Sequence, residues 1–336
     1  MRIGVFLPAA RFPGRDHGEV LSAAVDTAVA AERAGFDDVW IAEHHFMSYG
    51  VCPSATTLAG YVLGRTRRIE VGTAVSVLSS QHPIALAEQA ALLDQVSGGR
   101  FRLGVGRGGP WVDLEVFGTG LDRYENGFVE SLDLLIAALT RERVAAKGAI
   151  FRFREVEMVP RPGRPMRPMV ASTSPGTVKV AAARGLPMLL GMHIGDPDKA
   201  ALVEGYAGTA AAHGHDLTGI RHVAAGVAYV ADTTSEAVAA MKESLPRWLA
   251  PGLAGYRTVD DRTYIPRDAD DYADLLCRLH PVGSPGHCAD TMLATIKRTG
   301  VRHLILMVEG AGDPALTHQN LSRLGAEVLP VVRASC

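Results

Sequence analysis

The chain has 336 residues, with 34 Lys and Arg against 36 Asp and Glu, so its formal net charge is −2 at pH 7. Proteins that bind nucleic acid or anionic lipid through their charge usually carry a basic excess or a basic stripe, and this sequence has neither. No apolar run approaches the roughly 20 residues of a membrane-spanning helix, and the apolar run at 3–7 is too short for a signal peptide. We therefore expect a cytoplasmic protein that binds neither nucleic acid nor membrane.

Short apolar runs rich in β-branched residues alternate with longer helical patterns along the whole chain. Eight runs are typical of strands: 3–7, 39–42, 69–77, 101–105, 168–171, 188–190, 223–230 and 303–308. Helical patterns lie at 20–34, 54–64, 83–96, 126–139, 177–184, 198–213, 235–249, 287–299 and 316–329. Such alternation requires parallel strands joined by crossover helices, and eight units in this length favour an α/β fold of the (β/α)8 TIM-barrel type. The alternative, a doubly wound sheet, is disfavoured because no dinucleotide fingerprint follows the first strand.

Three stretches interrupt the alternation, at about 108–125, 148–166 and 250–282. Within the second, residues 151–159 alternate like part of a short hairpin, and within the third, residues 270–279 form a possible helix. The chain has no low-complexity stretch and no composition typical of a linker. We therefore expect a single barrel domain over 1–336 with these three insertions.

Two adjacent histidines follow the second predicted strand, at the end of the barrel where reacting groups gather. His44 and His45 would point in opposite directions on an extended segment, so they do not form a two-histidine metal site. One of them could serve as a general acid or base, because histidine titrates near neutral pH. The alternative is that one packs structurally and the other faces solvent. The four cysteines lack the spacing of a zinc site, and we expect no metal.

A glycine-rich loop follows the fourth predicted strand. Its glycines would let the backbone approach a flat or anionic ligand, and Arg107 offers a guanidinium suited to phosphate. The alternative is a tight loop with one exposed arginine. Arg123 lies in the long connection that follows, and it could join Arg107 around one phosphate.

Hydroxyl side chains follow the fifth predicted strand where a helix begins. Backbone N–H groups at a helix N-terminus, together with nearby hydroxyls, can bind an anion, although helix capping by Ser174 would explain most of this pattern. The candidates are Ser172, Thr173, Ser174 and Thr177. Together with the arginines, these residues predict that a phosphate-bearing cofactor binds at the mouth of the barrel.

At these positions the sequence resembles the bacterial luciferase family, in particular the flavin-binding α subunit. The similarity runs through nearly the whole chain in the same order and at similar spacing. Its segments lie at 39–46, 71–74, 82–83, 93–95, 97–101, 106–108, 116–119, 185–187 and 281–283.

The resemblance implies a barrel that binds reduced FMN at the C-terminal ends of its strands. His44 matches the catalytic histidine of the family. Arg107 and Arg123 match its phosphate-binding arginines, and Ser174 and Thr177 match its phosphate-binding hydroxyls. A one-residue length difference leaves Ser172 and Thr173 as possible substitutes for these hydroxyls. Ala74 and Val75 match a non-prolyl cis peptide under the flavin ring.

Two departures from the family pattern limit what is carried over. Gly106 occupies the place of a reactive cysteine beside the flavin, so any role of that thiol is missing. The similarity is poor over 250–282, which corresponds to a loop that shapes the substrate pocket. The identity of the substrate and any emission of light are therefore not implied.

The resemblance favours a two-component flavin-dependent monooxygenase. In this family reduced FMN from a separate reductase reacts with O2 to give a flavin hydroperoxide, which oxygenates an aldehyde, a ketone or a polyketide-type metabolite of antibiotic biosynthesis. One alternative is a hydride-transferring oxidoreductase that uses a deazaflavin, and another is a non-catalytic flavin-binding partner subunit. The family commonly pairs subunits through the helices after the second and third strands, which implies a homodimer.

Overall fold

The computed structural model describes residues 1–259 and 263–335. In this part of the chain, ten parallel strands form one sheet in the order β4-β6-β9-β10-β11-β14-β1-β2-β3-β5. They are β1 (Arg2–Leu7), β2 (Asp38–Ile41), β3 (Glu70–Thr73), β4 (Ser76–Val77), β5 (Phe101–Arg102), β6 (Gly104–Gly106), β9 (Met169–Ala171), β10 (Met188–Leu190), β11 (Val223–Val227) and β14 (His303–Met307).

The sheet curls until its two ends meet. β3 and β4 follow each other in the chain as one interrupted strand, and β5 and β6 form another. Because β3 pairs with β5 and β4 pairs with β6, these two composite strands close a barrel of eight positions. β1 completes the circle between β14 and β2, with Arg2 opposite His303 and Val5 opposite Val39. The predicted (β/α)8 barrel is confirmed.

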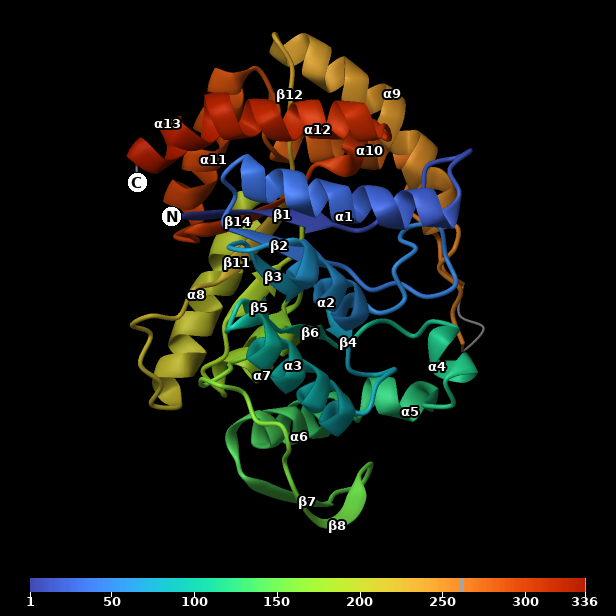
Figure 1. Cartoon of the computed structure of the whole chain (residues 1–336), viewed down its shortest axis with the longest axis vertical. Helices are drawn as coiled ribbons and strands as arrows, with labels where there is room; N and C mark the ends of the chain where they lie inside the picture. The colour runs from blue at the N-terminus through green and yellow to red at the C-terminus, as the bar shows by residue number, and fades with distance from the viewer. Residues whose placement is uncertain (260–262, 336) are drawn as a thin grey trace.

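Helices surround the barrel and connect its strands (Figure 1). The crossover helices are α1 (His17–Arg33), α2 (Ala55–Arg65), α3 (Pro83–Ser97), α6 (Phe128–Thr140), α7 (Pro175–Ala182), α8 (Asp196–Ala212), α9 (Thr234–Leu253) and α11 (Pro285–Thr299). Their ends follow local chemistry. Asp16 forms a capping box with Glu19 at the start of α1, and Gly98 ends α3 in the left-handed conformation, with φ of 65°.

The predicted interruptions contain secondary structure. The first holds α4 (Asp113–Val116) and α5 (Gly120–Glu125), and the third holds α10 (Ala269–Leu279), the helix expected at 270–279. The hairpin consists of β7 (Arg143–Lys147) and β8 (Arg152–Glu157), so its first strand begins before the predicted interruption. A small parallel pair, β12 (Tyr229–Val230) and β13 (Val282–Gly283), lies outside the barrel.

Two helices differ from the sequence prediction. α9 continues to Leu253 through Pro246 and Pro251, because the buried side chains of Trp248 and Leu253 hold its last turns in the core. The predicted helix at 316–329 comprises α12 (Pro314–Arg323), a π-helical turn (Leu324–Val328) and α13 (Leu329–Ala334). No helix in the described part of the chain is long and apolar enough to span a membrane.

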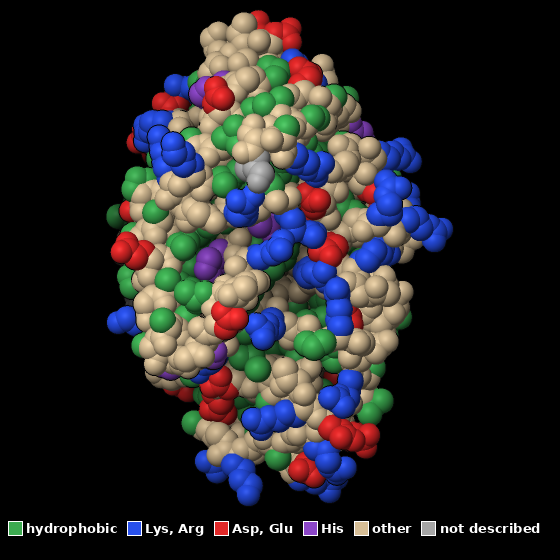
Figure 2. Space-filling view, turned by 90° about the vertical axis from the view of Figure 1, so that its left-hand side faces the viewer, with side chains coloured by type: hydrophobic (Ala, Val, Ile, Leu, Met, Phe, Trp, Pro, Cys, Tyr) green, Lys and Arg blue, Asp and Glu red, His purple; other side chains and the backbone are tan. Residues whose placement is uncertain are grey.

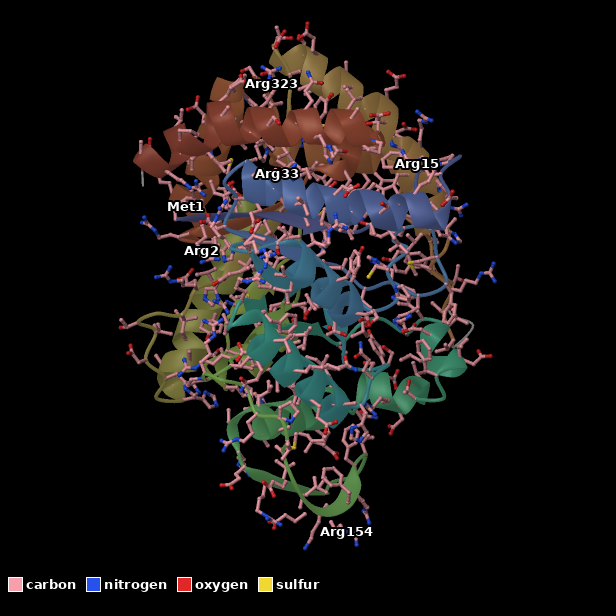
Figure 3. The ribbon with its side chains drawn as sticks, in the orientation of Figure 1. Met1, Arg2, Arg15, Arg33, Arg154 and Arg323 are labelled. Atoms are coloured by element: carbon pink, nitrogen blue, oxygen red, sulfur yellow. The ribbon has the colours of Figure 1, made fainter. Side chains whose placement is uncertain are left out.

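A network of buried charges ties together the N-terminal ends of the strands, the end where Met1 and Arg2 lie in Figure 3. Asp38 accepts hydrogen bonds from Nε1 of Trp40 at 2.7 Å, Nε2 of His303 at 2.9 Å and a guanidinium nitrogen of Arg2 at 2.8 Å. Arg2 also contacts Glu70 at 2.7 Å. Burial raises the pKa of Asp38, but His303 and Arg2 outweigh it, and the pKa is lowered overall.

Candidate active site

The C-terminal ends of the strands open into a cavity of about 580 Å³. Residues on or just after successive barrel strands line it. These include Phe6, Ala42, His44, Ala74, Val75, Arg107, Ala171, Thr173, Leu189, Gly191 and Ala225. In barrels of this type the reacting groups lie at this end, because the strand-to-helix loops converge there.

His44 lines the cavity and is half-buried. Its Nδ1 is buried and has no hydrogen-bond partner in the described residues. A Cβ added to Gly50 would lie 2.5 Å from this nitrogen, so the Nδ1 edge packs against Gly50 and only the opposite, Nε2, edge is left for a ligand. Burial, and then the charge of His45, lower the pKa of His44 to about 4. The imidazole is therefore neutral at pH 7.

Glu43 anchors the loop that carries both histidines. Its buried carboxylate accepts hydrogen bonds from Nε2 of Gln81 at 2.6 Å, the Val77 amide at 3.1 Å and the Ala55 amide at 3.3 Å. One of its oxygens lies 3.6 Å from Nε2 of His45. Glu43 thus joins the end of β2 to the start of α2 and to β4, and this connection fixes where His44 points.

The Ala74–Val75 peptide bond, which separates β3 from β4, is cis, as the resemblance implies. Both residues line the cavity. Gly106 packs directly behind them, because a Cβ added there would lie 2.7 Å from Cγ2 of Val75 and 3.4 Å from Cβ of Ala171. The valine therefore fills the space that a larger side chain at 106 would need.

The two predicted phosphate-binding arginines have different environments. Arg107 lines the cavity, and its guanidinium lies 4.4 Å from the ring centroid of Tyr124. Arg123 is buried and does not line the cavity; one of its nitrogens donates to the carbonyls of Gln81 at 2.6 Å and Leu78 at 3.2 Å. Its Nε is buried without a hydrogen-bond partner among the described residues. The backbone at 78–81 thus holds Arg123 just behind the wall that Val77 and Tyr124 form.

The hydroxyl residues after β9 also differ in whether they face the cavity. Thr173 lines the cavity. Ser172 is fully buried and donates to the Val170 carbonyl at 3.0 Å, so it faces away from the cavity. Ser174 caps α7, and its hydroxyl lies 3.2 Å from that of Thr177. This exposed pair marks the open N-terminus of α7.

Two insertions meet over the cavity. The Val112 amide donates to the Arg257 carbonyl at 2.9 Å, and the Val259 amide donates to the Pro110 carbonyl at 3.0 Å. This contact places the ring centroids of Trp111 and Tyr256 4.8 Å apart, and both side chains line the cavity. The outer part of the cavity is therefore aromatic.

Some cavity residues were not among the sequence candidates. His193 follows β10 and lines the cavity. Burial, and then the charges of Arg267 and Lys199, lower its pKa. The rule that pointed to His44, a polar side chain just after a strand, would also have found His193. No sequence signal paired Trp111 with Tyr256, because their contact depends on two irregular insertions.

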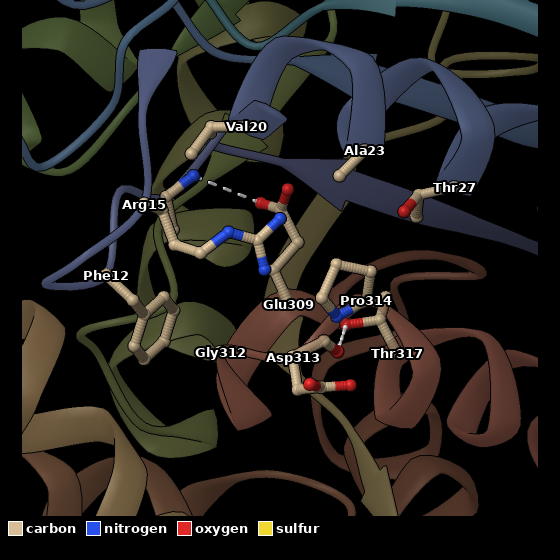
Figure 4. Close-up of a pocket in the computed structure, with 11 residues that line it drawn as sticks. Phe12, Arg15, Val20, Ala23, Thr27, Glu309, Gly312, Asp313, Pro314 and Thr317 are labelled. Carbon is tan, nitrogen blue, oxygen red and sulfur yellow. Dashed lines mark hydrogen bonds between the residues drawn. The ribbon is translucent and has the colours of Figure 1, made fainter. Parts of the chain in front are cut away.

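A much smaller pocket, of about 30 Å³, lies beside the first strand-to-helix loop. Glu309 lines it, between the loop of Arg15 and the first turn of α12 (Figure 4). Its carboxylate accepts a long hydrogen bond, 3.5 Å, from the Ala10 amide. Burial raises the pKa of Glu309 to about 7.

Comparisons with known proteins agree with this geometry. A family model described as luciferase-like monooxygenase matches residues 1–303. The chain is 28% identical, over 354 aligned residues and 99% of each chain, to the alkanal monooxygenase alpha chain of the Kryptophanaron alfredi symbiont.

Two solved structures share the fold. Monooxygenase RslO1 from Streptomyces bottropensis is 24% identical, with a TM-score of 0.86 over 98% of this chain and 99% of that one. The oxygenating constituent of 3,6-diketocamphane monooxygenase from Pseudomonas putida, a type II Baeyer–Villiger enzyme solved with FMN, is 22% identical, with a TM-score of 0.80 over 99% and 98%. The resemblance that the sequence indicated is confirmed: the chain belongs to the luciferase-like monooxygenase family and is an oxidoreductase.

Proposed function

We propose that the enzyme uses reduced FMN, supplied by a separate reductase, and O2 to oxygenate a small organic molecule. The observation that carries this proposal is that His44 and Arg107 line one cavity at the C-terminal mouth of the barrel. That cavity combines a neutral imidazole, a guanidinium and an aromatic outer part. These are the groups needed for proton transfer, phosphate binding and an apolar substrate.

The residues present fit the phosphate of FMN. Arg107 and Thr173 face the cavity, and Nε of Arg123 lacks a partner among the described residues. The N-terminus of α7, with Ser174 and Thr177, adds backbone N–H groups and a helix dipole that favour an anion. We expect Arg107, Thr173, Ser174 and Thr177 to hold the phosphate, Arg123 to support them from behind the cavity wall, and Ser172 only to shape the backbone.

The flavin ring would lie against Ala74 and Val75, beside Gly106. When bound, reduced FMN would supply the electrons with which O2 oxygenates the substrate. The role of His44 in this proposal is to exchange a proton through Nε2. Because its pKa is lowered to about 4, His44 is ready to accept a proton at neutral pH. The insertions that meet at Trp111 and Tyr256 would exclude water from the reaction.

The aromatic outer part favours a flat, apolar substrate, such as a polyketide-type metabolite of antibiotic biosynthesis. An aldehyde or a ketone would fit the same chemistry. A cytoplasmic location is part of this proposal, because reduced FMN must reach the enzyme from its reductase.

A homodimer is also part of the proposal. α2 and α3 expose the apolar side chains of Tyr61, Leu92 and Val96, which are 57%, 51% and 71% exposed. A pair of neighbouring helices that exposes large apolar side chains offers a surface to a second copy of the chain. The dimer would be tested with Leu92→Glu, which should shift the mass measured by light scattering from dimer to monomer.

The flavin assignment is tested by anaerobic titration with photoreduced FMN, followed by mixing with O2. We expect tight binding, and re-oxidation at a rate different from that of free reduced FMN. Arg107→Ala should weaken FMN binding by roughly tenfold or more, because a charge-assisted hydrogen bond is lost, and should change riboflavin binding little.

Two results would overturn the assignment. Tight binding of a reduced deazaflavin without binding of reduced FMN would point to hydride transfer. Binding of reduced FMN with unchanged re-oxidation and no oxygenated product would point to a non-catalytic flavin-binding subunit.

A further inference from the structure

A further cavity, lined by basic side chains, lies at the end of the barrel opposite His44. It has a volume of about 330 Å³, and its lining residues precede or begin β5, β9, β10 and β11. An adjoining cavity of about 340 Å³ shares Gly219, Ile220 and Arg221 with it. Among the described residues, no Asp or Glu lines either cavity. Figure 2 shows this face of the molecule, where Lys and Arg side chains gather around a hollow.

Four arginines line the N-terminal cavity of about 330 Å³, and two of them have structural partners. Arg102 donates to the Gly99 carbonyl at 3.0 Å and is paired with Glu70. Arg164 also donates to the Gly99 carbonyl, and its Nε lies 3.5 Å from Asp94. These two side chains bind carbonyls just after the end of α3, which is an ordinary structural role for arginine.

The other two arginines, Arg167 and Arg221, are exposed at the rim. Neither has a hydrogen bond or an ion pair from its side chain to any residue of 1–259 and 263–335. Close to Arg167, the hydroxyl of Tyr206 is buried and has no partner among the described residues. Burial raises the pKa of Tyr206 to about 12, and the charge of Arg167 opposes this rise. Two guanidiniums with unused hydrogen-bonding capacity therefore lie at the rim of one cavity, and the buried Tyr206 hydroxyl, which does not line it, lies near one of them.

The floor of this cavity is apolar. Phe101, Leu103 and Met166 are buried there, and Ile220 lies at its edge. Two uncommitted guanidiniums above an apolar floor match a ligand that joins an anionic group to an apolar body, because guanidinium binds carboxylate and phosphate through two parallel hydrogen bonds. The volume lies in the range of small-molecule sites.

We infer that this N-terminal cavity binds a small organic oxyanion, a carboxylate or a phosphate monoester on an apolar body, with Arg167 and Arg221 holding the anion. This site is independent of the flavin cavity, because it is formed by the opposite ends of the strands. It does not depend on the proposed function.

The test is calorimetric titration of the full chain with phenyl phosphate, benzoate and inorganic phosphate. Each titration is repeated with the Arg107→Ala variant, so that binding of the anion in the C-terminal flavin cavity is recognised. We expect saturable binding of phenyl phosphate or benzoate, clearly weaker binding of inorganic phosphate, and no effect of Arg107→Ala. Arg167→Ala and Arg221→Ala should each weaken binding about tenfold, since each removes charge-assisted hydrogen bonds.

The matched control is Arg154→Ala, the same change of charge on the exposed hairpin strand β8, which lies far from Arg2 in Figure 3. It should leave binding unchanged. The inference is overturned if neither organic anion binds saturably, if inorganic phosphate binds as tightly as they do, or if Arg154→Ala has the same effect as Arg167→Ala. It is also overturned if Arg167→Ala or Arg221→Ala lowers the thermal unfolding midpoint, because that would show a structural role. Comparing phenyl phosphate with benzoate distinguishes a phosphate ligand from a carboxylate.

Discussion

The buried carboxylate of Asp38 at the N-terminal end of the barrel and the buried histidines at its C-terminal end differ in how they are paired. At the N-terminal end, Asp38 is buried and makes hydrogen bonds or ion pairs with Trp40, His303 and Arg2. At the C-terminal end, Nδ1 of His44 and Nε2 of His45 are buried without hydrogen-bond partners among the described residues, and the buried carboxylate of Glu309 accepts hydrogen bonds from the backbone amides of Ala9 and Ala10.

This difference separates stability from activity. A fully paired buried charge keeps its surroundings in one arrangement, whereas an unpaired polar group costs free energy that a protein accepts where a ligand or a proton will use the group. We therefore expect substitutions near Asp38 to affect folding and substitutions near His44 to affect turnover.

The largest expected effect is on turnover in His44→Ala. Loss of a positioned acid–base group typically lowers the rate by about 10²–10⁴-fold. Reduced FMN should still bind, because its phosphate is held elsewhere. In the wild type, protonation of His44 should lower turnover only near pH 4, and His44 should contribute no change in turnover between pH 6 and 8. The measurement is steady-state kinetics across pH.

The matched control is His213→Ala, which removes an exposed histidine at the end of α8. It should leave turnover and its pH profile unchanged. Turnover in His44→Ala within a factor of two of the wild type would break the assignment of His44 and weaken the contrast between the two ends.

The largest effect on folding is expected for Asp38→Asn. It removes the charge that His303 and Arg2 face, and breaking a buried ion pair typically costs about 3–5 kcal/mol. Urea unfolding should show a lower midpoint with an unchanged slope. Arg143→Ala, which breaks an exposed pair with Glu155, should leave the midpoint unchanged. Equal effects of the two variants would contradict the distinction between the paired interior and the surface.

The same comparison predicts opposite pH dependences for two buried carboxyl groups. Folding lowers the pKa of Asp38, so its contribution to stability is present above its unfolded pKa and is lost as pH falls. Folding raises the pKa of Glu309 from 4.5 to about 7, so its contribution is complete below pH 4.5 and is lost as pH rises through 7.

Glu309→Gln should therefore stabilise the protein in alkali. At about 1.4 kcal/mol per pKa unit, a rise from 4.5 to about 7 makes the gain at pH 8 roughly 3–3.5 kcal/mol, and it should vanish near pH 4. The measurement is thermal unfolding at both pH values. A gain that is the same at both would show that repacking, and not loss of the charge, is responsible.

The sequence was sufficient for the barrel and for those site residues that follow strands. Strand ends are marked by turn residues after apolar runs, so His44 and Arg107 could be placed at the mouth of the barrel. The direction of each side chain was harder to predict. Ser172 and Thr173 are neighbours, yet only Thr173 lines the cavity, and this outcome depends on register after a strand of three residues.

Contacts between insertions lay beyond prediction for a physical reason. Trp111 and Tyr256 meet through two backbone hydrogen bonds between irregular segments almost 150 positions apart, and such segments have no periodicity that fixes their pairing. The burial of Arg123 by carbonyls of residues 78–81 was hidden for the same reason.

The smallest expected effect concerns Gly106, which the resemblance aligns with a reactive cysteine of the luciferases. Gly106→Cys should destabilise the protein by about 1–3 kcal/mol, because the new Cβ would lie 2.7 Å from Cγ2 of Val75. Val75→Ala removes that contact and leaves Cβ of Ala171 as the nearest atom, at 3.4 Å. The double variant should therefore lose less stability than the sum of the single variants, as expected for residues in contact. Additive losses of stability in urea unfolding would show that the side chain of Val75 is not what excludes a larger residue at position 106. The loss in Gly106→Cys would then have to come from other contacts.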